Sequence, residues 1–159
     1  MADALSDLDK RIALMRENLG HIENMNPWGS TVGFRPTKIE RGRVWGLQPY
    51  DKKLIGDPDS GVIHGGVIST LLDNLSGMAC MVTMEDFRFV ATLDLRIDYM
   101  RPAEKELDVI GEAECYHLTK SVAFTRAWAY HETKDKTIAT AQGAFAITTP
   151  RPLEHRGKL

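Results

Sequence analysis

One carboxylate stands in the most apolar stretch of this chain. Between Gly65 and Met84 the only formally charged side chain is Asp73. A carboxylate that is buried without a partner is costly, so Asp73 must meet a partner, water or a ligand. Two interpretations remain open at this point. Asp73 is either a catalytic group, acting as a general base on water or as a direct nucleophile, or a structural carboxylate that caps backbone groups at a dimer interface.

The tripeptide His64-Gly65-Gly66 stands at the start of this stretch and offers a second group that could take part in catalysis. Two glycines leave the first backbone N–H groups of a following helix unshielded, and donors at the positive end of a helix can hold developing negative charge. We expect Gly65 to be the oxyanion donor, although a tight turn and close helix–sheet contact would also explain both glycines. His64 is a catalytic candidate, but no second histidine stands at relay spacing, which favours a structural hydrogen bond that fixes the turn.

The neighbours of Asp73 on a helix add polar candidates for a binding site. Residues spaced by three and four share one helix face, and this face carries Asp73 and Ser76. Asn74 and Ser76 are candidates for orienting water or substrate, with a place at a dimer seam as the alternative for Asn74. Gly66 and Gly77 complete the expected substrate contacts.

The elements that must position these groups follow from hydrophobic periodicity. Residues 5–20 repeat apolar side chains every three or four positions, which predicts an amphipathic helix that is either a lid over a ligand tunnel or a flanking helix. In residues 92–99 the alternation predicts a half-buried strand whose buried face would carry Leu93, Leu95, Ile97 and Tyr99. Further strand-like runs cover residues 30–38, 43–48, 107–117, 121–132 and 136–148.

The order of these elements predicts an α+β fold. A flanking helix and a hairpin come first, then the apolar helix and then four strands, the last three of which have short connections that favour an antiparallel meander. The later strands are rich in alanine and glycine, and small residues let a helix lie close against a curved sheet. We therefore expect one long central helix wrapped by one curved antiparallel sheet.

A family resemblance rests on the central motif and the strand that follows it. His64-Gly65-Gly66, six residues and then Asp73, with Gly77 and Ala79, resembles the pattern of the PaaI-like branch of hot-dog acyl-CoA thioesterases. The segment from Thr92 to Ala103 is similar to the strand and Pro-Ala corner of that family, and the resemblance extends over residues 33–148. It implies hydrolysis of an acyl-CoA to a carboxylic acid and free CoA, with no cofactor because CoA is part of the substrate. It also implies a homodimer or a dimer of dimers (a homotetramer), in which Asp73 of one subunit faces Gly65 of the other.

The same resemblance assigns roles to two further residues and marks one departure. Thr92 matches a position with a small hydroxyl residue near the thioester, although threonine also suits any strand. Lys120, together with Arg126, stands in or near the hairpin where the family meets the CoA phosphates, although a lone turn lysine is commonly solvated. Relatives place Asn, Gln or His six residues before the motif histidine, whereas this chain has Pro58.

The missing side chain at Pro58 keeps other functions open. One alternative is a catalytically weak or silent acyl-CoA binding module, and another is a purely structural dimer. A hot-dog hydratase would need an Asp-x4-His pair, but no histidine follows Asp73 until His117. Side chains that could line a pocket for the acyl group, or belong to an ordinary core, are Phe34, Trp45, Tyr50, Met81, Phe87 and Phe89.

Composition bounds the remaining possibilities. The 159 residues fit one domain, expected at 30–149 after an N-terminal helix and linker at 1–29 and before a C-terminal tail at 150–159. A net charge of −2 argues against nucleic acid as a partner. Two isolated cysteines predict neither a disulfide framework nor a metal site. No signal-like or membrane-spanning segment stands out, so a cytoplasmic location is expected.

Overall fold

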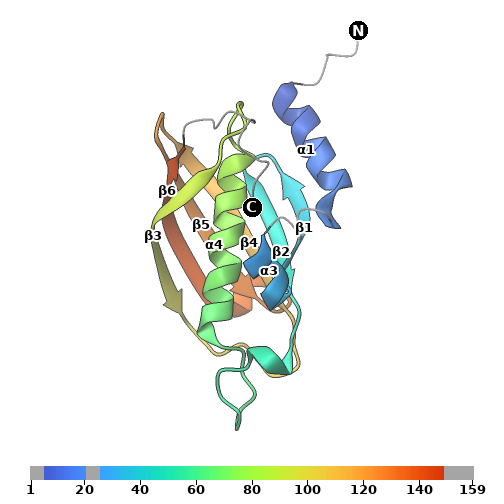
Figure 1. Ribbon diagram of the computed structural model, residues 1–159. Helices are drawn as coiled ribbons and strands as arrows, with labels where there is room; N and C mark the ends of the chain where they lie inside the picture. The colour runs from blue at the N-terminus through green and yellow to red at the C-terminus, as the bar shows by residue number, and fades with distance from the viewer. Residues whose placement is uncertain (1–5, 21–25, 149–159) are drawn as a thin grey trace.

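A long helix lies across one face of a curved antiparallel sheet in the computed structural model, which describes residues 6–20 and 26–148 (Figure 1). The helix is α4 (Gly65–Met81), and the sheet has the strand order β1-β2-β4-β5-β6-β3. The architecture confirms the predicted α+β class and wrapped helix. The strands are β1 (Arg35–Glu40), β2 (Arg43–Gln48), β3 (Val90–Tyr99), β4 (Val109–Leu118), β5 (Val122–Tyr130) and β6 (Ala139–Ile147).

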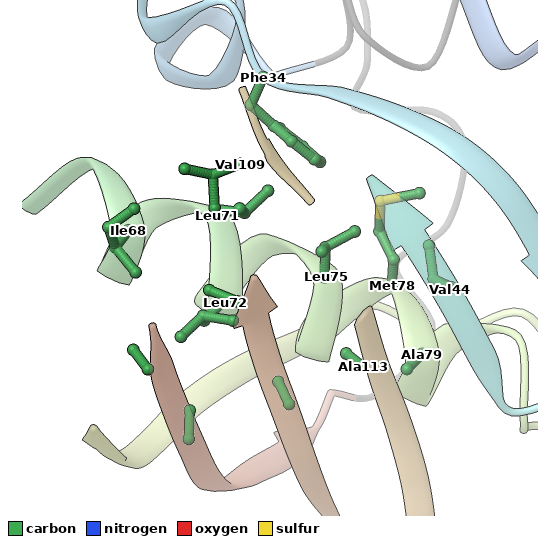
Figure 2. Close-up of a cluster of buried hydrophobic side chains, with 14 of the residues drawn as sticks. Phe34, Val44, Ile68, Leu71, Leu72, Leu75, Met78, Ala79, Val109 and Ala113 are labelled. Atoms are coloured by element: carbon green, nitrogen blue, oxygen red, sulfur yellow. The ribbon is translucent and has the colours of Figure 1, made fainter. Parts of the chain in front are cut away.

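The core forms where α4 meets the sheet (Figure 2). Leu71, Leu72 and Leu75 on α4 are fully buried. Glycine on β4 permits the close approach: a Cβ atom added at Gly111 would lie 2.5 Å from Cδ1 of Leu75. The expectation that small residues let the helix approach the sheet is therefore confirmed at this position.

The helix α1 (Asp7–Glu17) packs beside the sheet within the same chain. Ser6 begins it by accepting a hydrogen bond from the Asp9 amide, and Leu8 and Ile12 are buried. Arg16 ties it to β1 by donating from Nε to the carbonyl oxygen of Ile39 at 2.6 Å.

The start of the first predicted strand is wrong. Residues 27–32 form a short helix, α3 (Pro27–Val32), and β1 begins only at Arg35. Asn26 caps this helix by accepting from the amides of Trp28 and Gly29, and Pro27 suits the first turn because that position needs no N–H donor. Gly33 then ends the helix in the left-handed region with φ of 77°. The expected boundary between residues 29 and 30 falls inside α3.

The connections match the predicted meander. Strands β4, β5 and β6 pair antiparallel in sequence order, whereas β3 pairs with β6 and lies at the sheet edge. Two 3-10 helices, η1 (Lys52–Leu54) and η2 (Lys134–Lys136), lie in the connections. The expected C-terminal tail, residues 150–159, lies outside the described residues. No described helix is long and apolar enough to cross a membrane.

Candidate active site

Asp73 and Thr92 meet between α4 and β3. The Thr92 hydroxyl donates to Oδ1 of Asp73 at 2.8 Å. Asp73 is half-buried, so its carboxylate is partly shielded while remaining within reach of solvent. A hydroxyl donor of this kind fixes the orientation of a carboxylate and leaves its second oxygen available to bind water or substrate.

A β-bulge aims Thr92 at Asp73. Thr92 lies opposite Phe145 of β6, and the next paired residue, Asp94, lies opposite Ala144, so Leu93 is the extra residue. The bulge breaks the simple alternation, and Thr92 shares the helix-facing side with Leu95. The predicted buried position of Leu93 is therefore wrong, because its side chain is 61% exposed.

The predicted face of β3 is also wrong at its far end. Tyr99 is 52% exposed, because it is the last residue of the edge strand β3, where it pairs with Ala139 of β6. Leu95 and Ile97 lie between these two exposed positions and are partly buried against the core, as predicted.

A cavity of about 420 Å³ opens beside Asp73 and Thr92. Among the described residues that line it, Asp73 is the only acidic side chain and most of the rest are apolar. The candidate pocket residues Phe34, Met81, Phe87 and Phe89 do line it. Trp45 and Tyr50 do not: Lys38 lies over the Trp45 ring, and Tyr50 donates to the carbonyl oxygen of Gly61. The full lining is Arg11, Met15, Asn26, Phe34, Pro36, Asp73, Asn74, Gly77, Met78, Met81, Phe87, Phe89, Val90, Thr92 and Phe145.

Asn74 joins α4 to α3 at the polar end of this cavity. Its Oδ1 accepts a hydrogen bond from Asn26, whose own Oδ1 caps α3, and its amide nitrogen donates to the carbonyl oxygen of Thr70 at 2.8 Å. Asn74 therefore lines the cavity and also holds a wall of it in place.

Ser76 and Gly77 differ although they are adjacent. Ser76 is fully buried, lines no part of the cavity, and its hydroxyl has no partner among the described residues. Gly77 lines the cavity one turn after Asp73, and a Cβ atom there would meet Val90 Cγ2 at an ordinary 3.6 Å. A small side chain at Gly77 would therefore fit and would reduce the cavity.

The motif residues before α4 form its N-terminal cap. Nδ1 of His64 accepts from the Gly66 amide at 2.9 Å, so His64 satisfies one of the free donors of the first turn. The Gly65 amide has no acceptor among the described residues. The Tyr99 hydroxyl donates to the Gly65 carbonyl oxygen at 2.8 Å. Gly65 is thus held in place while its N–H stays available.

Gly65 and Asp73 lie apart within one chain. They are separated by eight residues, or roughly 12 Å along a helix that rises about 1.5 Å per residue. Gly65 borders a different hollow of about 320 Å³, shared with Tyr99, Met100 and Arg101. One chain therefore does not bring the expected oxyanion donor to the expected carboxylate.

The loop before α4 carries Pro58 at an exposed turn. Asp57 accepts from the Ser60 hydroxyl and from the amides of Asp59 and Ser60. These hydrogen bonds hold the pKa of Asp57 below its usual range, and the bond from the Ser60 hydroxyl has the largest effect. Asp57 is therefore an acceptor-only group engaged in its own turn.

Lys120 and Arg126 do not line the cavity. Lys120 is exposed in the connection between β4 and β5. Arg126 forms an ion pair with Glu114 and lies 5.6 Å from the centre of the Tyr116 ring. Within the part of the chain that the structure describes, no group of three His, Cys, Asp or Glu side chains is placed to hold a metal ion, and both cysteines are free.

Among the contributors to the site that were not found from the sequence are three with polar groups: Arg11, Asn26 and Tyr99. Asn26 carried a usable signal, since Asn before Pro marks a helix start. Arg11 and Tyr99 act on segments distant in sequence, through the carbonyl oxygens that follow α4 and through the Gly65 carbonyl oxygen.

Comparisons with known proteins find a matching family model, related sequences and related structures. A model of the Thioesterase superfamily matches residues 60–138. Acyl-coenzyme A thioesterase 13 of Homo sapiens is 35% identical over 79 residues, covering 50% of this chain and 56% of that protein. A putative esterase of Halobacterium salinarum is 32% identical over 107 residues, covering 62% of this chain and 70% of that protein. The solved structure of a Pseudomonas aeruginosa protein is 38% identical with a TM-score of 0.70, covering 85% of this chain and 97% of that chain.

The chain spans little more than half the length of the human relative, but the other two relatives are covered over more than two thirds of theirs. These matches confirm the resemblance inferred from the motif. The chain belongs to the thioesterase superfamily and has its hot-dog fold.

Proposed function

We propose that this protein hydrolyses an acyl-CoA thioester to a carboxylic acid and free CoA. The observation that carries the proposal is the half-buried Asp73 carboxylate, oriented by Thr92 at one end of an otherwise largely apolar cavity. A thioester has the matching chemistry, because its carbonyl needs a base or nucleophile and its acyl chain needs an apolar wall. The name of the human relative, an acyl-coenzyme A thioesterase, supports the same substrate class.

Asp73 serves in this proposal in one of two ways. As a general base it takes a proton from water, the resulting hydroxide adds to the thioester carbonyl, and the CoA thiolate leaves and is protonated. As a nucleophile it forms an acyl–aspartyl anhydride with loss of CoA, which water then hydrolyses to regenerate the carboxylate. Neither route needs a cofactor.

The site is proposed to need a second copy of the chain. Developing negative charge on the carbonyl oxygen requires a donor, and the free Gly65 amide lies at the other end of α4 from the cavity. The edge strand β3 supports pairing of two chains, because its outer edge is open and Leu93, Tyr99 and Met100 are exposed nearby. In the dimer, Gly65 of one chain would face Asp73 of the other.

The exposed position of Pro58 favours a second candidate, a silent acyl-CoA binding module. No side chain from that position supports the carbonyl oxygen, so binding without turnover is the specific alternative. Thiol release from a panel of short, medium, long and aryl acyl-CoAs separates the two. The thioesterase predicts turnover of at least one class that Asp73→Asn abolishes, whereas CoA binding without any thiol release would establish the silent module.

Isotope labelling separates the two roles of Asp73. In a single turnover in ¹⁸O-water with enzyme in excess, label on Asp73 establishes the nucleophilic route with water attack on the aspartyl carbonyl of the anhydride, whereas the general-base route places label only on the released acid. Mass spectrometry of the peptide that contains Asp73 measures the difference.

A further inference from the structure

The cavity beside Asp73 runs along α4 towards its C-terminal end. Asp73, Gly77 and Met81 are spaced four residues apart on one helix face, and all three line it. From Asp73 to Met81 the helix rises roughly 12 Å, a length that an extended chain of about ten carbon atoms spans. The cavity therefore has a polar end at Asp73 and Thr92 and an apolar length of two helical turns.

The far end is built by α1 together with the end of α4. Arg11 donates to the carbonyl oxygens of Met81 at 3.4 Å, Glu85 at 3.0 Å and Met84, and it lies 5.8 Å from the centre of the Phe87 ring. A guanidinium at the last carbonyls of a helix is well placed electrostatically.

This contact fixes a second methionine in the cavity wall. Met15 lies one turn after Arg11 on α1 and lines the same cavity as Met81. Two flexible methionine side chains from different helices thus line one cavity, and Met81 marks the part of it that the chain end would reach.

We propose that Met81 and Met15, the latter held by α1, limit the length of the acyl chain that this protein accepts to about ten carbon atoms. The inference rests on the proposed function for its occupant, because the thioester carbonyl must lie at Asp73 for the chain to point at Met81. The cavity walls between these ends, including Phe34, Met78 and Phe145, suit an alkyl chain.

Alkyl-CoA thioethers of increasing chain length test this without requiring turnover, since they carry no hydrolysable carbonyl. Calorimetric titration of the full chain should show affinity rising about fourfold per methylene while the chain is buried and levelling at about ten carbons. In Met81→Ala and in Met15→Ala the levelling point should move to chains about two carbons longer, because each substitution enlarges the far end. Met15→Phe should move it to shorter chains.

Leu14→Ala is the matched control. Leu14 neighbours Met15 on α1 but is 60% exposed and lines no part of the cavity, so its profile should equal that of the wild type. Thermal unfolding of each variant establishes that the protein is folded at the temperature of titration.

The outcomes separate this inference from the proposed function. A levelling point that stays the same in Met81→Ala, Met15→Ala and Met15→Phe overturns the inference even if acyl-CoAs are hydrolysed. A shifted levelling point with no hydrolysis of any acyl-CoA supports the inference and overturns the thioesterase. Absence of all thioether binding, or affinity that is independent of chain length, overturns the length limit.

Discussion

The middle and the start of α4 present their candidate groups in different ways. At Asp73 the reactive group is a side chain, and one chain supplies its hydroxyl partner Thr92 and the cavity beside it. At Gly65 the group is a backbone amide, and one chain supplies only its support, through His64 and Tyr99. The surroundings of Asp73 therefore come almost entirely from one chain, whereas those of the Gly65 amide do not. A catalytic site that needs both must draw them from two chains.

The largest effect on activity is expected from substitution of Asp73. Asp73→Asn keeps the shape and the hydrogen bond from Thr92 but removes the base or nucleophile, so kcat should fall by about 10³ to 10⁴. Thiol release under saturating acyl-CoA measures it. Thioether affinity should stay close to wild type, and a variant that retains more than a tenth of the wild-type kcat would exclude Asp73 as the catalytic group.

The next largest effect on activity is expected from loss of the Gly65 amide. Gly65→Pro removes the free N–H, while the first helical position tolerates proline and the extended His64, with ψ of 135°, suits a residue before it. Loss of an oxyanion donor should lower kcat by about 10² to 10³. Gly65→Ala keeps the N–H, and its Cβ would meet the Tyr99 hydroxyl at an ordinary 3.4 Å, so it should stay near wild type.

Mixing the two inactive variants tests whether Asp73 and the Gly65 amide of one site come from different chains. After Asp73→Asn and Gly65→Pro are unfolded together and refolded, half of the dimers should hold one intact site, giving about a quarter of wild-type activity. Activity that stays at the level of the separate variants would place both groups of a site in one chain.

The fold was largely predictable because its elements show clean periodicity. The apolar stretch around Asp73 and the alternation of the later strands indicated a wrapped helix, and both were found. The helix at Pro27–Val32 was missed because its cap, Asn26, fell in the expected linker and its last residues fell in the first predicted strand. The position of Leu93 was missed because a bulge inserts one residue without any change in the alternating pattern.

The site was predictable only in part, for a related reason. The isolated charge made Asp73 a candidate, and the glycine pair made Gly65 one, since both are local features of the sequence. The bond between Thr92 and Asp73 depends on strand register, and those from Tyr99 and Arg11 depend on how distant segments pack. Thr92 was proposed from family resemblance and not from its own spacing.

A smaller effect is expected from the partner of the carboxylate. Thr92→Val keeps the shape and removes the hydroxyl, so Asp73 loses one orienting donor and kcat should fall about tenfold. Thr92→Ser keeps the donor and should recover most of the activity. If Thr92→Val keeps wild-type activity while Thr92→Ser loses it, the methyl group and not the hydroxyl is what the site requires.

The smallest effect is expected from the partner of the backbone amide. Tyr99→Phe removes the hydrogen bond to the Gly65 carbonyl oxygen, and a neutral hydrogen bond of this kind contributes about 1 kcal/mol, so kcat should fall several-fold. The fall should appear in kcat with little change in KM, because in the proposed site Tyr99 holds the peptide that would stabilise the transition state and does not line the cavity for the acyl chain. In the Gly65→Pro background the same substitution should cost almost nothing, since the donor it supports is already gone. Equal losses in both backgrounds would show that Tyr99 acts on dimer stability and not through the Gly65 amide. The start of α4 would then serve assembly of the dimer, whereas the middle of α4, at Asp73, would serve the reaction.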